Sequence, residues 1–193
     1  MVILVNGLPA AGKSTLAPSL ASALSLPLLS KDTIKETHAD VLGSDPPPGL
    51  TQRQWNRQLG AAASYTMWAL LSASTPGAVL ESSWRADVRG FVEAGLRQAG
   101  VVQVAEVWCE APLEVLRERF ARRWASSHAI HGAAPDDDEW AQMVKHAEPL
   151  SLGPVLRVDT STEVDLAGVV EWCRVNAASD LVNSSNPVHD AAP

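Results

Sequence analysis

The sequence predicts an α/β protein whose parallel β-sheet carries helices on both faces. Five short, almost continuous apolar runs occur along the chain of 193 residues, and the segments between them are long enough for one helix or more. Apolar strands without polar alternation are typical of parallel sheets, because such strands are buried on both faces. The runs cover residues 1–6, 26–30, 77–82, 101–109 and 153–160.

The first run leads into GLPAAGKST at residues 7–15, which fits the pattern G-x-x-x-x-G-K-[ST]. The motif lies between a predicted strand and a predicted helix, so backbone N–H groups and the helix dipole can surround phosphate oxygens. Lys13 would neutralise the β- and γ-phosphates, and Ser14 would ligate Mg²⁺. The motif predicts a nucleoside triphosphate site formed by Gly7, Ala10, Ala11, Gly12, Lys13, Ser14 and Thr15.

The second run is followed by SKDTIKE at residues 30–36, which starts a helix. Ligands of open α/β sheets bind outside the carboxyl ends of the strands, and Asp32 lies at such an end. An aspartate there is a favoured helix cap and dipole partner, and a carboxylate can also accept the proton of a hydroxyl group during phosphoryl transfer. The two roles are compatible. Lys35 follows one helical turn later, where it is placed to hold an acceptor or a phosphate.

The interval 31–76 must hold two helices, because the prolines of residues 43–49 interrupt it. Thr51 and Gln54 form a capping-box pattern that opens the second helix, which should end at about Ser74. The face expected to pack on the core comprises Trp55, Leu59, Ala62, Thr66 and Leu70. The opposite face, which would suit a small hydroxylated acceptor, comprises Gln54, Arg57, Gln58, Tyr65 and Trp68. Alternatively, Tyr65 and Trp68 pack beneath the proline-rich loop.

Glu81 lies near the end of the third run and is a second carboxylate near the same sheet edge. Glu81 could bind Mg²⁺ through water, or act as the base while Asp32 contacts the metal, or be a plain acidic residue at a strand exit. Arg85 follows four residues later and is a candidate for binding acceptor or phosphate, with a solvated surface charge as the alternative.

The fourth run precedes a helix over residues 111–124 that gathers Arg119, Arg122 and Arg123 on one flank. Such a cluster suits phosphoryl transfer, which is catalysed by positioning and charge neutralisation. The small and acidic segment that follows is typical of a lid. Its His128 and His131 are interpreted as surface histidines rather than metal ligands, because no cysteine or third histidine flanks them.

Composition and missing motifs exclude several classes of protein. The net charge of −7 argues against a general nucleic-acid binder. The sequence has no run of 18 apolar residues, so no membrane span is predicted. The N-terminal MVILVNG lacks the basic region of a signal peptide, and the two cysteines indicate reduced thiols, so we expect a cytoplasmic protein. A signalling GTPase would need N-K-x-D, which does not occur, and the length leaves no room for the extra helical domain of an AAA+ ATPase.

The sequence resembles the small P-loop kinases built like nucleoside-monophosphate kinases. Within them it is most similar to the group of chloramphenicol phosphotransferase, zeta-toxin-type kinases and the kinase domain of polynucleotide kinase. The resemblance covers about residues 1–160 and is carried by GLPAAGKST, SKDTIKE, VLESSWR and PLEVLRERFARR.

This resemblance implies a P-loop NTPase three-layer sandwich with five parallel strands in the order 2-3-1-4-5, a mobile lid after the fourth strand, and ATP with Mg²⁺ as phosphate donor. It also implies that Asp32 is the base, and that Arg119 and Arg123 pack on the adenine side and clamp phosphates. The central segment 40–75 matches no single substrate class.

We therefore predict one kinase domain over residues 1–176, with an acceptor-binding segment at about 40–75, a lid at about 119–140 and a flexible tail at 177–193. It would transfer phosphate from ATP to a hydroxyl group of an antibiotic, sugar or nucleoside, as a monomer or homodimer. Lys13, Asp32 and Arg123 would be catalytic, and the acceptor would contact Asp32, Lys35, Arg57, Trp68, Glu81 and Arg85. The alternatives are a 5′-hydroxyl nucleic-acid end kinase and a non-catalytic nucleotide-binding switch. The preference for ATP over GTP is left open.

Overall fold

A computed structural model describes residues 1–131 and 134–177 of the chain. Five parallel strands form one sheet in the order β2-β3-β1-β4-β5, which confirms the predicted P-loop NTPase-like fold. The predicted tail lies almost wholly in residues 178–193, outside the described residues. The strands are β1 (Val2–Gly7), β2 (Leu28–Ser30), β3 (Ala78–Glu81), β4 (Ala105–Glu110) and β5 (Val155–Asp159).

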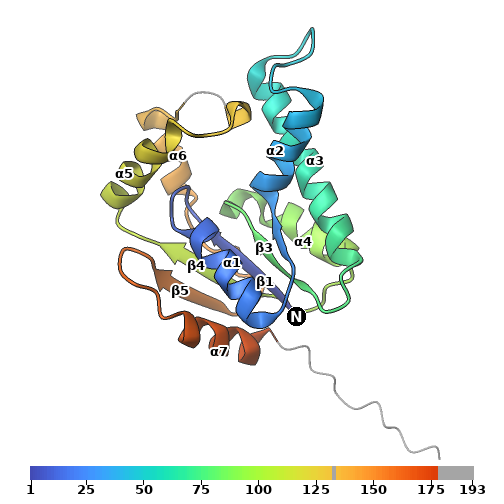
Figure 1. Cartoon of the computed structure of the whole chain (residues 1–193), viewed down its shortest axis with the longest axis vertical. Coiled ribbons are helices and arrows are strands. Elements are labelled where there is room, and N and C mark those ends of the chain that lie inside the picture. Colours follow the sequence, from blue (N-terminus) through green and yellow to red (C-terminus); the bar gives the residue numbers. More distant parts are fainter. Residues whose placement is uncertain (132–133, 178–193) are drawn as a thin grey trace, which may run out of the picture.

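Helices cover both faces of the sheet (Figure 1). They are α1 (Lys13–Leu24), α2 (Lys31–Leu42), α3 (Gln52–Ser72), α4 (Arg89–Gln98), α5 (Leu113–Trp124), α6 (Asp137–Lys145) and α7 (Leu166–Asn176), with 3₁₀ turns η1 (Ala86–Val88) and η2 (Ala129–His131). The interval between β2 and β3 holds two helices, as predicted, and Thr51 and Gln54 form the capping box that opens α3.

The alternation of β1 divides the core into two layers. Ile3 and Val5 are fully buried in a cluster that includes residues of α1 and α7. Val2 and Leu4 belong to a second cluster, which includes residues of α3 and α4. Because both faces of β1 are buried, its sequence is continuously apolar, and this explains why the strand was recognisable without alternation.

The predicted core face of α3 is right at its start, where Leu59 is buried and Trp55 packs against the same cluster, and wrong further along. Ala62 and Leu70 are exposed, and the buried residues of the helix are Leu59, Ala63, Ser64, Met67, Trp68 and Leu71. The helix is rotated by about one residue relative to the expectation. Alanines fill its middle and carry little hydrophobic signal, so the large Met67 and Trp68 determine which side meets the sheet.

The strand register brings chemically important residues to one edge of the sheet. Val5 of β1 lies beside Glu81, and Ser30 of β2 lies beside the same glutamate on its other side. Gly7, where the phosphate loop begins, lies beside Cys109 of β4. The carboxyl ends of β2, β3, β1 and β4 therefore lie around the loop that follows β1. Ligands of open α/β sheets bind at this edge of the sheet.

Candidate active site

The loop after β1 has the backbone of an anion-binding nest. Gly12 has φ 80°, and Ala10 also adopts a positive φ, 63°. Within the described residues, the amides of Ala10, Gly12, Lys13 and Ser14 make no hydrogen bond, and α1 begins at Lys13. Free amides at a helix start, aimed by left-handed backbone, are the arrangement that binds phosphate oxygens.

Lys13 is buried at the centre of this loop. Its Nζ donates to the carbonyl oxygen of Leu8 at 2.8 Å, and the residue is 5% exposed. Burial lowers the pKa of Lys13, and the nearby charges of Glu81 and Asp32 oppose that shift. The lysine therefore faces two carboxylates, and a triphosphate would add the negative charge that the loop amides are arranged to receive.

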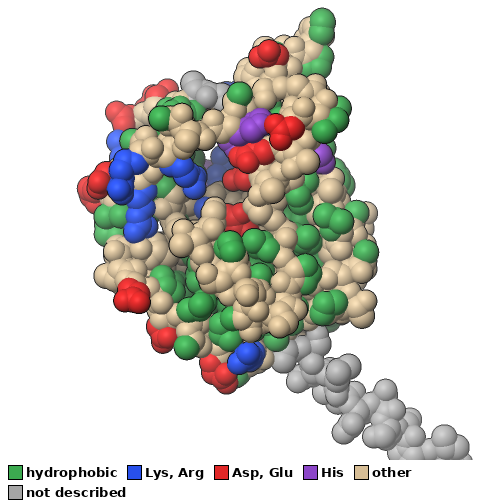
Figure 2. All heavy atoms as spheres, in the orientation of Figure 1, with side chains coloured by type: hydrophobic (Ala, Val, Ile, Leu, Met, Phe, Trp, Pro, Cys, Tyr) green, Lys and Arg blue, Asp and Glu red, His purple; other side chains and the backbone are tan. Residues whose placement is uncertain are grey.

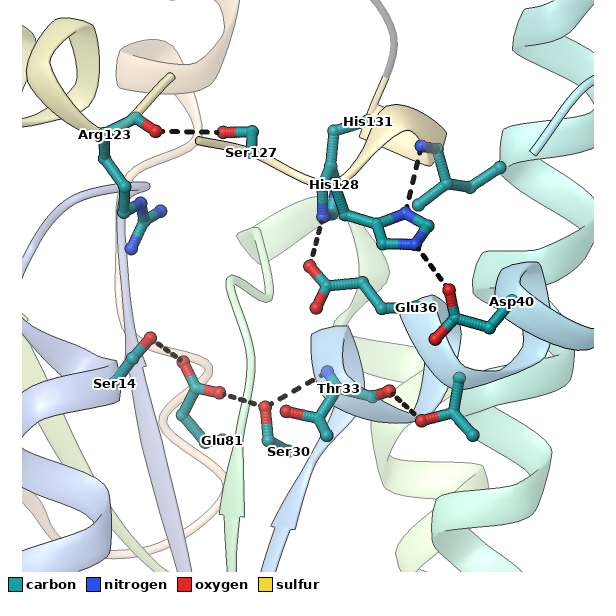
Figure 3. Close-up of polar contacts among 12 residues, drawn as sticks. Ser14, Ser30, Thr33, Glu36, Asp40, Glu81, Arg123, Ser127, His128 and His131 are labelled. Atoms are coloured by element: carbon teal, nitrogen blue, oxygen red, sulfur yellow. Dashed lines mark hydrogen bonds and ion pairs between the residues drawn. The ribbon is translucent and has the colours of Figure 1, made fainter. Parts of the chain in front are cut away.

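Glu81 is held between two hydroxyl groups (Figure 3). The Oγ of Ser14 donates to one carboxylate oxygen at 3.2 Å, and the Oγ of Ser30 donates to the other at 2.6 Å. Only 3% of Glu81 is exposed. The carboxylate therefore lies directly against the serine that the sequence motif assigns to Mg²⁺.

The oxygen atoms of Ser14 and Glu81 fit a magnesium ion. Mg²⁺ is commonly held by one or two protein oxygens together with substrate phosphates and water, rather than by a complete protein cage. Among residues 1–131 and 134–177, no group of three or more His, Cys, Asp or Glu side chains is arranged to hold a metal.

Asp32 is not the cap of α2. The N-cap is Ser30, whose Oγ accepts from the amide of Thr33, and Asp32 lies in the first helical turn. The prediction that Asp32 caps α2 was therefore wrong, since the cap lies two residues earlier. Serine caps helices as well as aspartate does, and Ser30 comes first at the end of the strand. The Asp32 side chain is exposed, and it contributes to the walls of two cavities.

The larger cavity, of about 1220 Å³, lies over the phosphate loop and reaches α5 and the segment after β5. The smaller, of about 550 Å³, lies between α2, α3 and the segment after β3. Both are lined by Pro9, Asp32 and Ser83. The two cavities therefore meet at Asp32. We call the larger one the nucleotide cavity and the smaller one the acceptor cavity.

The α5 arginines do not act as one cluster. Arg119 donates to Thr160 through both terminal nitrogens, to Oγ1 at 3.2 Å and to the carbonyl oxygen at 2.7 Å, and Thr160 in turn donates to the carbonyl oxygen of Ala11. Arg123 lines the nucleotide cavity and points toward the phosphate-loop side in Figure 3. Arg122 is exposed and pairs with Glu118.

Two histidines after α5 contact carboxylates of α2. His131 Nε2 lies 2.7 Å from Glu36 Oε1, and His128 Nε2 lies 3.1 Å from Asp40 Oδ1 (Figure 3). The sequence interpretation gave these histidines no partner, because nothing local links them to residues about 90 positions earlier. In Figure 2, basic side chains over α5 face acidic and histidine side chains over α2 across a hollow in the surface.

Of the residues predicted to bind the acceptor, Lys35, Arg57 and Arg85 line the acceptor cavity. Trp68 does not. It is 2% exposed and stacks on Trp84 within the core, so its predicted contact with a ligand is wrong. Glu81 lines the nucleotide cavity instead.

The sequence interpretation missed Lys31 and Arg53, which also line the acceptor cavity. Each lies next to or one turn from a residue that was singled out, so a search for basic residues at helical spacing would have found them. It also missed Asn6, whose side-chain oxygen accepts from the amides of Gly7 and Trp84 while its nitrogen donates to the buried Glu106. Asn6 thereby fixes the start of the phosphate loop relative to the wall of the acceptor cavity.

The fold and the loop geometry define a P-loop nucleotide-binding protein. The model of a family described as "AAA domain" matches residues 2–150, and the chain belongs to that family. The name is shared with the large AAA+ ATPases that the sequence argues against. The described part of the chain holds one five-stranded sheet with its flanking helices.

Solved structures share this fold. A protein provisionally assigned as a kinase, from Chloroflexus aurantiacus, is 31% identical, with a TM-score of 0.74 over 91% of this chain and 97% of that one. Kti12 from Chaetomium thermophilum, in complex with ADP-AlF3, is 18% identical, with a TM-score of 0.62 over 93% of this chain and 100% of that one. Shikimate kinase from Acinetobacter baumannii, in complex with shikimate, is 16% identical, with a TM-score of 0.60 over 90% and 91%.

None of the curated proteins compared matches the chain. Within the described ranges, no helix has the length and apolar character needed to span a bilayer.

Proposed function

We propose that the protein is an ATP- and Mg²⁺-dependent kinase that phosphorylates a hydroxyl group of a small molecule. The observation that carries this proposal is the position of Asp32, where the cavity over the phosphate loop meets a second cavity. A kinase needs this arrangement, since a donor and an acceptor must meet at a carboxylate that orients the attacking oxygen. The likeness to a provisionally assigned kinase and to shikimate kinase supports it.

In the proposed reaction, the acceptor hydroxyl lies beside Asp32 and its oxygen forms a bond to the γ-phosphorus of ATP. The bond from that phosphorus to the β–γ bridging oxygen breaks, ADP leaves, and the hydroxyl proton passes to the Asp32 carboxylate. Mg²⁺, when bound, would supply charge neutralisation on the phosphates. Lys13 and the loop amides would hold the β- and γ-phosphates, and Arg123 would stabilise the charge that develops during transfer.

We assign Glu81 to the support of Mg²⁺ binding and not to the role of catalytic base. Its two carboxylate oxygens are engaged by Ser14 and Ser30, whereas Asp32 is exposed to both cavities. The finer resemblance to the chloramphenicol phosphotransferase group agrees with an aspartate base at this place.

The test is acceptor-dependent release of ADP across a panel of hydroxylated antibiotics, sugars, nucleosides and 5′-hydroxyl oligonucleotides. We expect at least one small acceptor to stimulate release, and Asp32→Asn to lower kcat by about 10²- to 10⁴-fold. Asp45→Asn is the matched control, because Asp45 is exposed and lines neither cavity.

Near-normal turnover of Asp32→Asn on a genuine acceptor would refute the base assignment. Tight ATP binding without stimulation by any acceptor would instead favour a nucleotide-binding switch.

A further inference from the structure

Basic side chains gather around the acceptor cavity. The chain has a net charge of −7, yet five of its 15 lysine and arginine residues line this one cavity. Among its lining residues Asp32 is the one carboxylate. The five are Lys31, Lys35, Arg53, Arg57 and Arg85.

Most of these cations have no protein partner. Arg85 pairs with Asp87, with a shortest contact of 2.6 Å. Within residues 1–131 and 134–177, the ammonium groups of Lys31 and Lys35 and the guanidinium groups of Arg53 and Arg57 make no hydrogen bond or ion pair. Arg53 and Arg57 are exposed, so water can solvate them, whereas Lys31 is half-buried and Lys35 is buried. A buried polar group without a hydrogen-bond partner calls for an explanation.

Lys35 is the strongest case, because the residue is buried, with 8% of its surface exposed. Burial lowers the pKa of Lys35, and the charge of Asp32 opposes that shift. Burial likewise lowers the pKa of Lys31. Buried cations are costly unless an opposite charge accompanies them, so a ligand that brings negative charge into the cavity would relieve this cost.

The cations form one wall. Lys31 and Lys35 are one turn apart on α2, and Arg53 and Arg57 are one turn apart on α3, which runs beside α2 (Figure 1). Two guanidinium groups one helical turn apart can grip a carboxylate or phosphate through paired hydrogen bonds. The rest of the lining includes an apolar wall of Leu8, Trp84, Val88, Phe91, Trp108 and Met143, together with Arg85 and His146.

We propose that the acceptor is a small hydroxylated anion, whose carboxylate or phosphate group is held by Lys35, Arg53 and Arg57 while its hydroxyl group lies at Asp32. The inference rests on the proposed function, and it narrows the acceptor from any hydroxyl compound to an anionic one. Neutral sugars and neutral antibiotics are thereby disfavoured, since they would leave the cationic wall without a counter-charge. The apolar wall would contact the carbon skeleton of the same molecule.

The test uses matched neutral and anionic compounds: glycerol against glycerate, and glucose against gluconate and glucose 6-phosphate. ADP release is measured with each, for the wild type and for Arg57→Gln. We expect the anionic members to stimulate release and the neutral members not to. Arg57→Gln should raise the KM for the anionic acceptor by about tenfold or more, with kcat and the KM for ATP much less affected. Comparison of the carboxylates, glycerate and gluconate, with glucose 6-phosphate shows which anionic group the site prefers.

Arg97→Gln is the matched control, because Arg97 is exposed on α4, pairs with Glu93 and lines neither cavity. Efficient transfer to a neutral compound, or a lower KM for a 5′-hydroxyl oligonucleotide than for any small anion, would overturn the inference while the kinase function stands.

If no compound stimulates ADP release, the proposed function fails, and calorimetric titration of the ADP-bound protein with gluconate and glucose 6-phosphate decides the inference separately. Saturable binding that Arg57→Gln abolishes and Arg97→Gln retains supports an anion site. No saturable binding of either probe overturns it.

Discussion

Glu81 and Asp32 occupy different positions around the same buried lysine. Both carboxylates lie near Lys13; Glu81 is the last residue of β3, and Asp32 lies just after β2. Glu81 is enclosed, and each of its oxygens already accepts one hydrogen bond, from Ser14 or from Ser30, which favours a role beside the metal ligand over contact with an acceptor. Asp32 is exposed at the junction of two cavities. The difference in surroundings gives the two carboxylates different roles in the proposed reaction, and the two roles can be tested separately.

Glu81→Gln should affect the metal more than the chemical step. The amide keeps the shape of the side chain and removes its charge beside Ser14. We expect the Mg²⁺ concentration for half-maximal rate to rise by about 10- to 100-fold, as is typical when a group that supports a metal ligand is changed. Titration of Mg²⁺ at saturating ATP and acceptor checks this, with Glu110→Gln, at a half-buried carboxylate that pairs with Arg157, as the control. A normal Mg²⁺ dependence together with a large loss of kcat would return Glu81 to the role of base.

Gly12→Ala should weaken nucleotide binding and lower stability. Gly12 has φ +80°, and an added Cβ would lie 3.0–3.1 Å from three side-chain atoms of Thr160. The matched control is Gly90→Ala, since a Cβ at Gly90 meets nothing within 4 Å and the residue is helical. We expect the control to be neutral or stabilising by about 0.5 to 1 kcal/mol. Thermal denaturation with and without ATP measures both effects. Equal behaviour of the two variants would show that the loop does not need its left-handed backbone.

At the scale of elements, Thr160 joins three parts of the nucleotide cavity: α5 through Arg119, the phosphate loop through Ala11, and the end of β4 through the carbonyl oxygen of Glu110. Thr160→Val keeps the volume and removes the hydroxyl group. We expect the KM for ATP to rise by about three- to tenfold, the effect of one or two lost hydrogen bonds. Thr160→Ser should restore the wild-type value in steady-state kinetics. Failure of serine to rescue would mean that packing, and not the hydroxyl group, matters.

The contacts between η2 and α2 should hold the segment after α5 in place. His131 and His128 pair with Glu36 and Asp40, and the amide of Ile130 donates to His128 Nδ1. In the double variant Glu36→Gln, Asp40→Asn, we expect amide hydrogen exchange at residues 129–131 to accelerate by roughly 2- to 30-fold, since such pairs contribute about 0.2 to 1 kcal/mol each. Glu118→Gln, which changes only an exposed pair on α5, is the control. Unchanged exchange would show that packing alone orders η2.

At the scale of the molecule, the sequence predicted those features that depend only on residues close together in the chain. The apolar strands, the phosphate loop and the capping box of Thr51 each depend on a few consecutive residues, and the parallel arrangement then placed Glu81 and Asp32 at the same edge. The side of α3 that carries Trp68 depends on how the helix meets the sheet, so it was assigned wrongly. The sequence pointed to Lys35, Arg57 and Arg85, but that α2 and α3 bring their basic residues to one cavity depends on how the two helices pack. The histidine contacts join segments about 90 residues apart and were not visible in the sequence.

The reactivity of the two cysteine thiols should distinguish the folded from the unfolded protein. Cys109 lies in β4 and Cys173 in α7, and both are buried. Burial raises the pKa of each thiol to about 12. At pH 8 roughly one thiol in ten thousand would be the reactive thiolate, against a substantial fraction in the unfolded chain. We therefore expect almost no reaction with a disulfide reagent in the native state, and two equivalents after denaturation.

The raised pKa of the two thiols should also make the free energy of unfolding depend on pH in the alkaline range. The folded-state pKa lies above the unfolded value of about 8.5, so the folded state favours the neutral thiols. Their contribution to the free energy of unfolding is complete below pH 8.5 and decreases as the pH rises toward 12. The lowered pKa values of Lys13, Lys31 and Lys35 act in the opposite direction, so the comparison is between two proteins. Between pH 7.5 and pH 10 in urea denaturation, the wild type should lose stability relative to the double variant Cys109→Ala, Cys173→Ala. Rapid labelling of the native protein at pH 8, not slowed by ATP and Mg²⁺, would contradict the burial of Cys109 beneath the phosphate loop.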